Sequence, residues 1–257
     1  MKKILTVVML FMVLHLSAQD SLKIMSYNLR FGQLSSMDSI ARFISSENPD
    51  LVALQECDWA TYRESAPGEN GVKFINVLAY ETGMFGLYGK TIDYEKGYYG
   101  IGILSKYPVV SCERKLLPNS GVENEPRAML LCKVELPDGD MVTFVCTHLD
   151  VDSPELRGKQ LEFINREVKR IKTPVILAGD MNAVPESSEI RKGLKGWKHL
   201  TDNSMMTFSS TDPHIKIDYI VGRPAGRISL VSTEVCYHVF LSDHFPVIST
   251  IRLNINK

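Results

Sequence analysis

Strand-like apolar runs that end in polar residues recur along this chain. Residues 22–27 form one such run, which ends at Asn28, and residues 51–54 form another, which is followed closely by Glu56. Between them, residues 37–47 carry apolar side chains at spacings of three and four, the spacing of one buried helix face. The pattern therefore predicts a strand, a helix and a second strand, with a polar side chain at the end of each strand.

The same arrangement returns in the second half of the chain. Residues 141–146 form a strand-like run followed by His148, and residues 155–171 have the apolar spacing of a helix. Residues 175–178 then lead into the polar sequence Gly-Asp-Met-Asn at 179–182. The repetition is one of pattern and not of sequence. It predicts two similar halves, each with a sheet and an outer helix, whose sheets pack against each other.

The segment between these halves has the character of further sheet structure. We expect a helix near residues 70–82 and strands at residues 100–104 and 129–134, with Pro-Asp-Gly at 137–139 as a turn. The pattern contains no linker and no boundary of a second domain. It predicts one α/β domain over residues 19–257.

The first residues of the chain have the features of an export signal. Lys2 and Lys3 precede an apolar run at residues 4–16, and small residues follow it. The run is too short for a comfortable membrane span, so we predict a signal peptide over residues 1–18 and a periplasmic or extracellular product. An uncleaved anchor is the alternative.

Charge and cysteine content narrow the classes of function. The chain has 29 basic and 30 acidic residues, and removal of Lys2 and Lys3 with the signal peptide leaves 27 against 30, a net charge of −3. Such a balance does not favour a protein that follows a nucleic-acid backbone, although it does not exclude a local basic patch. The cysteines are odd in number and lack metal-ligand spacing, so we expect mainly buried free thiols with at most one or two disulfides. They are Cys57, Cys112, Cys132, Cys146 and Cys236.

Eight polar residues at or just beyond the ends of apolar runs are candidates for one shared site. Each alone has an ordinary structural explanation, but strand ends that converge on one rim of a sandwich would bring them together. Four carboxylates, two amides and two imidazoles suit Mg²⁺- or Mn²⁺-assisted hydrolysis of a phosphate ester, because carboxylate and amide oxygens are the ligands of hard cations. The eight are Asn28, Glu56, His148, Asp180, Asn182, Asp218, Asp243 and His244.

These residues belong to short motifs that resemble the endonuclease/exonuclease/phosphatase superfamily. The motifs occur in the order of that family and extend over residues 22–253. They are Ser26-Tyr27-Asn28, Leu54-Gln55-Glu56, Thr147-His148, Gly179-Asp180-Met181-Asn182, Lys216-Ile217-Asp218-Tyr219-Ile220 and Ser242-Asp243-His244-Phe245-Pro246. The resemblance implies a four-layer α-β-β-α sandwich made of two mixed, mainly antiparallel sheets with helices outside.

The resemblance also implies roles for the candidate residues in metal binding. Glu56 would be the principal metal ligand, with Asn28 beside it and Asp243 near the metal or a second ion. Asp180 and Asn182 would align the attacking water or bind the phosphate.

Three further roles concern the phosphate group. His244, oriented by Asp218, would act as the base or as the partner of the phosphoryl charge. His148 would contact the phosphate from the other side, and Arg127, just before a predicted strand, would be a phosphate-binding arginine.

The sequence thus predicts an exported, monomeric phosphoesterase that uses Mg²⁺ or Mn²⁺ and direct attack by water on a phosphodiester or phosphomonoester. A nuclease acting on DNA or RNA is one alternative. A membrane-lipid phosphodiesterase is another, since residues 84–99 are aromatic, although we expect that segment to pack within the sheet region or line the cleft. A third alternative, of another class, is a module that binds metal or phosphate without turnover.

Overall fold

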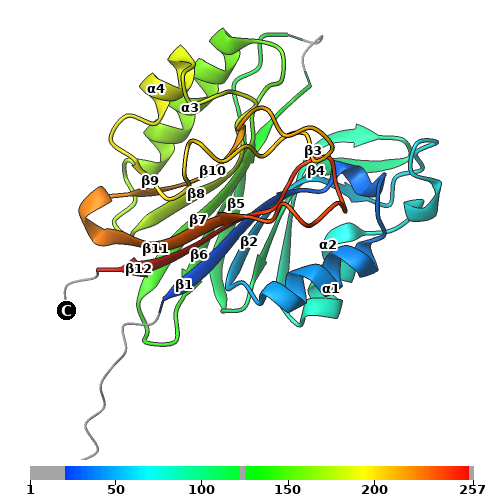
Figure 1. Cartoon of the computed structure of the whole chain (residues 1–257), viewed down its shortest axis with the longest axis horizontal. Coiled ribbons are helices and arrows are strands. Elements are labelled where there is room, and N and C mark those ends of the chain that lie inside the picture. Colours follow the sequence, from blue (N-terminus) through cyan, green and yellow to red (C-terminus); the bar gives the residue numbers. More distant parts are fainter. Residues whose placement is uncertain (1–20, 122–124, 255–257) are drawn as a thin grey trace, which may run out of the picture.

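Two sheets packed face to face form the centre of the molecule, and helices cover their outer faces (Figure 1). The computed structural model describes residues 21–121 and 125–254, so the predicted signal peptide at residues 1–18 lies outside the described residues. Each sheet has six strands and combines parallel with antiparallel neighbours. The predicted four-layer α-β-β-α sandwich is confirmed.

The order of strands is similar in the two sheets. The first sheet has the order β11-β12-β1-β2-β4-β3, formed by Ile228–Val235, Val247–Leu253, Leu22–Asn28, Leu51–Trp59, Gly97–Ser105 and Phe85–Tyr94. The second has the order β5-β6-β7-β8-β10-β9, formed by Val109–Leu116, Ala128–Glu135, Met141–His148, Val175–Asp180, Asp218–Arg223 and Lys198–His199.

Two helices belong to each outer layer. Helices α1 (Met37–Glu47) and α2 (Phe74–Thr82) cover the first sheet, and α3 (Pro154–Val168) and α4 (Ser188–Gly193) cover the second (Figure 1). Short 3-10 turns lie at Arg30–Gly32 (η1), Pro67–Glu69 (η2) and Ala225–Arg227 (η3). Within the described part of the chain, no helix has the length and apolar character needed to cross a membrane.

Three apolar clusters hold these layers together. The central cluster lies between the sheets and includes Ile24, Phe144 and Ile176. A second cluster joins the first sheet to α1 and α2, and a third joins the second sheet to α3 and α4. Because both faces of the central strands are buried, their sequences are nearly continuous apolar runs, which is why they could be recognised from the pattern.

The two parallel strand pairs explain why polar side chains gather at one rim. Strands β1 and β2 are parallel, with Asn28 opposite Gln55, and β7 and β8 are parallel, with His148 opposite Asp180. In both units the strands are joined through a helix, α1 or α3, so the predicted repeat is present. Parallel strands end at the same edge, and the facing sheets bring the two edges together.

Asp218 and His244 reach this rim from the other direction. The sequence pattern places Asp218 and the pair Asp243-His244 at the ends of strand-like runs, but Asp218 is the first residue of β10, and residues 241–246 form a loop before β12. Strand β10 runs antiparallel to β8, with Asp218 opposite Asp180, and β12 runs antiparallel to β1. Antiparallel pairing turns the beginnings of these strands toward the rim where β1 and β8 end.

The first and last strands, β1 and β12, are neighbours in the first sheet, and the two ends of the described chain meet at the end of the sandwich opposite the polar rim. Leu22 of β1 lies opposite Ile251 of β12, so both ends of the described domain lie at the edge away from the polar rim.

The five cysteines do not share one environment. Cys57, Cys132, Cys146 and Cys236 are buried thiols, as expected, whereas Cys112 on β5 is exposed.

Candidate active site

Glu56 occupies an irregular position near the end of β2. The pairing of β2 with β4 shifts between Leu54 and Cys57, and Glu56 has a φ of 53°. A β-bulge with a positive φ in a non-glycine residue redirects a side chain at a cost in backbone energy, and such residues concentrate at functional sites. Here the bulge turns the Glu56 carboxylate into the cleft at the rim.

The surroundings of Glu56 leave room for a cation. Oε1 accepts a hydrogen bond of 3.0 Å from Asn28 Nδ2. Burial raises the pKa of Glu56, although the hydrogen bond from Asn28 opposes this rise. No lysine, arginine or histidine among the described residues forms an ion pair with Glu56 at close range. A partly buried carboxylate without such an ion pair is therefore the strongest donor for a divalent ion in this cleft.

Asp180 lies at the centre of the site. Its Oδ2 accepts a 3.1 Å hydrogen bond from Asn28 Nδ2 and lies 3.6 Å from Nε2 of both His148 and His244. Its Oδ1 accepts a 2.8 Å hydrogen bond from the backbone N–H of Asn182. Burial and the neighbouring Asp218 carboxylate raise the pKa of Asp180 to about 7, against the lowering effect of His244. A carboxylate with that pKa can accept a proton near neutral pH.

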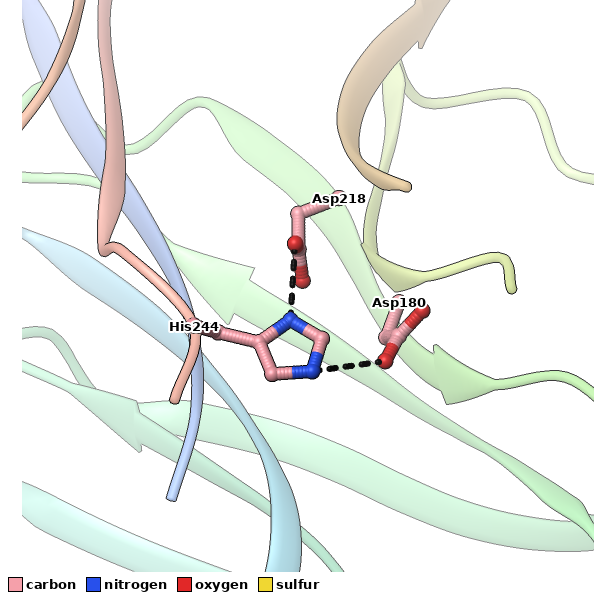
Figure 2. Close-up of side chains that lie close together, drawn as sticks. All are labelled: Asp180, Asp218 and His244. Atoms are coloured by element: carbon pink, nitrogen blue, oxygen red, sulfur yellow. Dashed lines mark hydrogen bonds and ion pairs between the residues drawn. The ribbon is translucent and has the colours of Figure 1, made fainter. Parts of the chain in front are cut away.

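His244 is held between two carboxylates (Figure 2). Its Nδ1 is 2.9 Å from Asp218 Oδ2, and its Nε2 faces Asp180. Burial opposes a charge on the ring, but Asp218 and Asp180 outweigh it and raise the pKa of His244 to about 10. The ring is therefore an imidazolium at neutral pH, with both N–H groups directed at carboxylate oxygens.

His148 has the opposite surroundings. Arg127 Nη1 lies 3.1 Å from its Nδ1, and Asn182 Nδ2 lies 3.0 Å from its Nε2. A protonated ring could not accept from either donor. Burial, together with the charges of Arg127 and His244, holds the pKa of His148 well below its usual range. His148 is thus a neutral ring within the same cluster.

Asp243 lines the cleft but has a partner of its own. Its carboxylate forms an ion pair with Arg30, whose backbone N–H donates to Asn28 Oδ1. The ion pair uses Asp243 Oδ2, which leaves Oδ1 as the oxygen that could face a metal in the cleft. Arg30 and Phe31 both have positive φ angles, of 43° and 41°, in the η1 turn next to the rim.

A cleft of about 600 Å³ opens over these groups. Its size is within the range of small-molecule sites. Of the predicted site residues, Glu56, Arg127, His148, Asp180, Asn182, Asp243 and His244 line it, while Asn28 and Asp218 lie behind them as hydrogen-bond partners.

Three carboxylate and imidazole groups meet closely enough to suggest a metal cluster, but their chemistry indicates otherwise. One ligand atom from each of Asp180, Asp218 and His244 lies within 4.8 Å of the others. A protonated imidazole has no lone pair for a metal, and His244 already gives one N–H to Asp218. The three side chains are therefore partners of one another in the cluster, whereas the Glu56 carboxylate is in no ion pair with a described residue and is the freer oxygen donor for a cation.

Sequence reasoning missed the walls of the cleft. Arg63 lies with its guanidinium 4.2 Å from the ring centres of both Phe31 and Tyr94, and Phe208 packs 4.8 Å from the His244 ring. Phe31, Arg63 and Phe208 lie in turns or loops with no periodic pattern, so the sequence carried no signal for them. The aromatic segment 84–99 does supply part of the wall, through Ile92, Tyr94 and Tyr99 at its end.

Comparison with known proteins agrees with the fold. The model of the Endonuclease/Exonuclease/phosphatase family matches residues 25–244, and the chain belongs to this family. The uncharacterized protein YbhP of Escherichia coli K12 is 24% identical over 253 residues, covering 91% of this chain and 98% of YbhP.

Solved structures of the family have the same fold. An endonuclease/exonuclease/phosphatase family protein of Bacteroides thetaiotaomicron superposes with a TM-score of 0.75 at 19% identity, over 92% of this chain and 99% of that one. A mannosyl-6-phosphatase of the same species gives 0.72 at 19% identity, over 90% and 99% of the two chains. The family includes metal-dependent phosphoesterases and nucleases, and this chain has the fold of the family.

Proposed function

We propose that this protein is an exported, divalent-metal-dependent phosphoesterase that acts on a small phosphate ester by direct attack of water. One observation carries the proposal: a buried carboxylate with a pKa of about 7, Asp180, lies between a neutral and a charged histidine in a cleft whose floor also exposes Glu56. Such a set can take a proton from water and stabilise a phosphoryl group at the same time.

The residues of the cleft divide the work as follows. Asp180 accepts the proton of the attacking water, which Asn182 helps to place. The His244 imidazolium and Arg127 face the negative charge that develops on the phosphoryl oxygens, and neutral His148 contacts the same group. Asp218 keeps the His244 ring oriented and charged.

A divalent ion fits the donor set of this site. Glu56 and Asn28 would hold it, with Asp243 as a further ligand, and Mg²⁺ or Mn²⁺ suits oxygen donors of this kind. When bound, the ion supplies positive charge that polarises the phosphate and stabilises the leaving oxygen.

A small substrate is favoured over a polymer by the charges around the cleft. Glu56, Glu125, Asp180 and Asp243 line it, whereas its arginines are Arg63, already paired with Asp58, and Arg127. A protein that follows a polyanionic strand needs a track of free basic groups. The lining provides one phosphate-sized positive region and aromatic walls for the leaving group.

Turnover on a substrate panel tests this proposal. The mature chain, with Mg²⁺, Mn²⁺ or chelator, would be given sugar phosphates including mannose 6-phosphate, inositol phosphates, a generic phosphodiester, sphingomyelin, DNA and RNA. We expect metal-dependent hydrolysis of one or more small esters and a loss of about 10²–10³-fold in Glu56→Gln and His244→Ala. Glu47→Gln, at a half-exposed glutamate paired with Lys23, is the matched control.

Four results would contradict parts of the proposal. Turnover that survives the chelator and both substitutions would remove the assigned site. Hydrolysis of nucleic acid alone would identify a nuclease, and tight binding of Mn²⁺ and phosphate without any turnover would identify a binding module. Recovery of the protein in the cytoplasmic fraction of the producing cell would contradict export.

A further inference from the structure

Two cysteines lie side by side in the hairpin formed by β5 and β6. Cys112 and Cys132 are directly opposite each other in the antiparallel register, and their sulfur atoms are 2.7 Å apart. Even carbon atoms, which are smaller, pack at about 3.5–4.0 Å when not bonded. Among the described residues, no other pair of cysteines makes a hydrogen-bonding contact between sulfur atoms.

The strand that carries Cys112 is held mainly by its backbone pairing with β6. Strand β5 is at the edge of the second sheet, and none of its eight side chains is buried. Cys132, by contrast, lies fully buried in the central cluster on β6. A covalent link between them would attach the exposed middle of this edge strand to the core, to which only Val109 at its start adds apolar packing.

The same hairpin delivers a predicted substrate-binding residue. The connection from β5 to β6 ends at Arg127, immediately before Ala128, and Glu125 in that connection forms a 2.9 Å ion pair with Arg127. A link between Cys112 and Cys132 would close this connection into a loop and reduce the number of conformations available to it before folding.

We propose that Cys112 and Cys132 form a cross-strand disulfide when the protein is in an oxidising compartment, and that the other three cysteines remain thiols. The bond requires the two sulfur atoms to approach by about 0.65 Å, to the S–S length of about 2.05 Å. Cross-strand neighbours with sulfur atoms this close need no rearrangement of the sheet.

The reaction is a thiol–disulfide exchange with an external disulfide as the oxidant. Exposed Cys112, whose pKa is lowered by the Cys132 thiol, attacks a sulfur of the oxidant as the thiolate and releases one thiol. The Cys132 sulfur then attacks Cys112 Sγ in the mixed disulfide, loses its proton and releases the second thiol. Two electrons and two protons pass to the oxidant, which leaves fully reduced.

Counting thiols in the intact protein tests the proposal directly. The full mature chain would be incubated with oxidised glutathione, denatured, alkylated and mapped without reduction. We expect three alkylated cysteines, Cys57, Cys146 and Cys236, and one cross-linked peptide joining Cys112 to Cys132. Five alkylated cysteines, or a cross-link to any other cysteine, would overturn the proposal.

Thermal unfolding provides a second measurement, which is independent of turnover. The oxidised protein should lose roughly 5–10 °C in Tm on addition of dithiothreitol, because the unfolded chain regains the freedom that the disulfide removes. Cys112→Ala, at an exposed position, should show no such response, whereas Cys236→Ala should respond as the unaltered chain does. An equal response in Cys112→Ala and the unaltered chain would contradict the proposal.

Discussion

Two histidines lie beside the same carboxylate oxygen in this site, but one ring is neutral and the other is positively charged. His148 and His244 each place Nε2 at 3.6 Å from Asp180 Oδ2, and both rings are buried. Their other ring nitrogens decide the outcome, because Arg127 can only donate to His148 and the Asp218 carboxylate can only accept from His244. Because the two rings are equally buried, the difference in charge between them comes from the second neighbour of each ring.

Replacement of Asp218 tests this explanation. In chelator-treated protein, Asp218→Asn should bring the pKa of His244 down from about 10 toward its usual 6.5, measured by NMR titration of the ring. Because folding raises the pKa of His244, the charged ring stabilises the folded state. This stabilisation is fully present below pH 6.5 and is lost as the pH rises toward 10. The Tm of Asp218→Asn should thus be roughly 5–10 °C lower at pH 6 and approach that of the unaltered protein near pH 10.

Asp212→Asn is the control for this substitution. It removes an exposed aspartate 3.9 Å from the exposed His214, so it should change neither Tm nor the titration of His244. An Asp218→Asn deficit of equal size at pH 6 and pH 10 would contradict the role of His244 charge.

At the scale of elements, a glycine sets the approach of the two strands that carry His148 and Asp180. Gly179 in β8 has a φ of 156°, and a Cβ added there would lie 2.0 Å from the carbonyl oxygen of Thr147 in β7. No shift of a flexible side chain could relieve a contact with backbone. The parallel pairing that joins the two halves of the acid–base cluster therefore requires glycine at this position.

We expect Gly179→Ala to destabilise the fold by more than about 3 kcal/mol, lowering Tm by about 10 °C or preventing soluble expression. Gly158→Ala is the control, because Gly158 lies within α3 and its added Cβ would meet only an ordinary contact at 3.9 Å. Alanine there should be neutral or stabilising. A Gly179→Ala protein with unchanged Tm would show that the strands can separate at little cost.

Arg63 joins several elements at the wall of the cleft. It makes two hydrogen bonds to the buried Asp58 carboxylate, at 2.6 and 3.1 Å, and packs between Phe31 of η1 and Tyr94 of β3. Arg63→Ala would leave the buried Asp58 carboxylate without a cationic partner, and it would remove the contact of Arg63 with Tyr94 in the β3–β4 hairpin. We expect a loss of about 2–4 kcal/mol in stability, measured by urea unfolding, and a rise in KM larger than the fall in kcat.

Lys90→Ala is the comparison for this effect. Lys90 pairs with the exposed Asp93 on the same hairpin, and loss of an exposed pair should cost less than about 1 kcal/mol. If the two substitutions cost the same, Arg63 does not hold the wall together.

The sequence predicted the buried central strands and helices better than the exposed edge strand β5 and the ends of the helices. Burial gives a recognisable sequence pattern. A strand buried on both faces is a continuous apolar run, and a helix buried on one face has apolar residues at spacings of three and four, which is why the sequence identified β1, β2, β7, β8, α1 and α3. Strand β5 leaves none, since none of its side chains is buried. The predicted helix near 70–82 begins only at Phe74, and that predicted over 155–171 spans Pro154–Val168.

The candidate site was also predicted only in part. The rim residues could be listed from motifs, and the resemblance also implied the contact of Asp218 with His244, which is present at 2.9 Å. Other partners could not be predicted, because they depend on which distant segments lie side by side. The ion pair of Asp243 with Arg30 is one example, and the tilted packing of Phe208 against the His244 ring is another.

At the scale of the whole molecule, one core binds both halves. The cluster between the sheets draws residues from β1 and β2 on one side and from β6, β7 and β8 on the other. Neither sheet could keep its inner face out of water without the other, so the two halves should not unfold separately.

The two tryptophans make this expectation measurable. Trp59 lies with the outer cluster of the first sheet, and Trp197 lies in that of the second. We expect Trp59→Phe and Trp197→Phe, each with one remaining tryptophan, to give fluorescence transitions in urea whose midpoint coincides with that from circular dichroism of the same variant. Midpoints separated by more than about 0.5 M would indicate halves that unfold independently.

The pairing of β1 with β12 has a consequence for engineering. Because Leu22 lies opposite Ile251 at the edge away from the cleft, a short linker could join the two ends of the domain without crossing the site. New ends could be opened at the Asp138-Gly139 turn between β6 and β7, which lies at that same edge, since β7 ends at the rim with His148. Such a circular permutant would begin with β7-α3-β8 and end with β6, and it would reverse the order in which the ribosome makes the two halves of the active site.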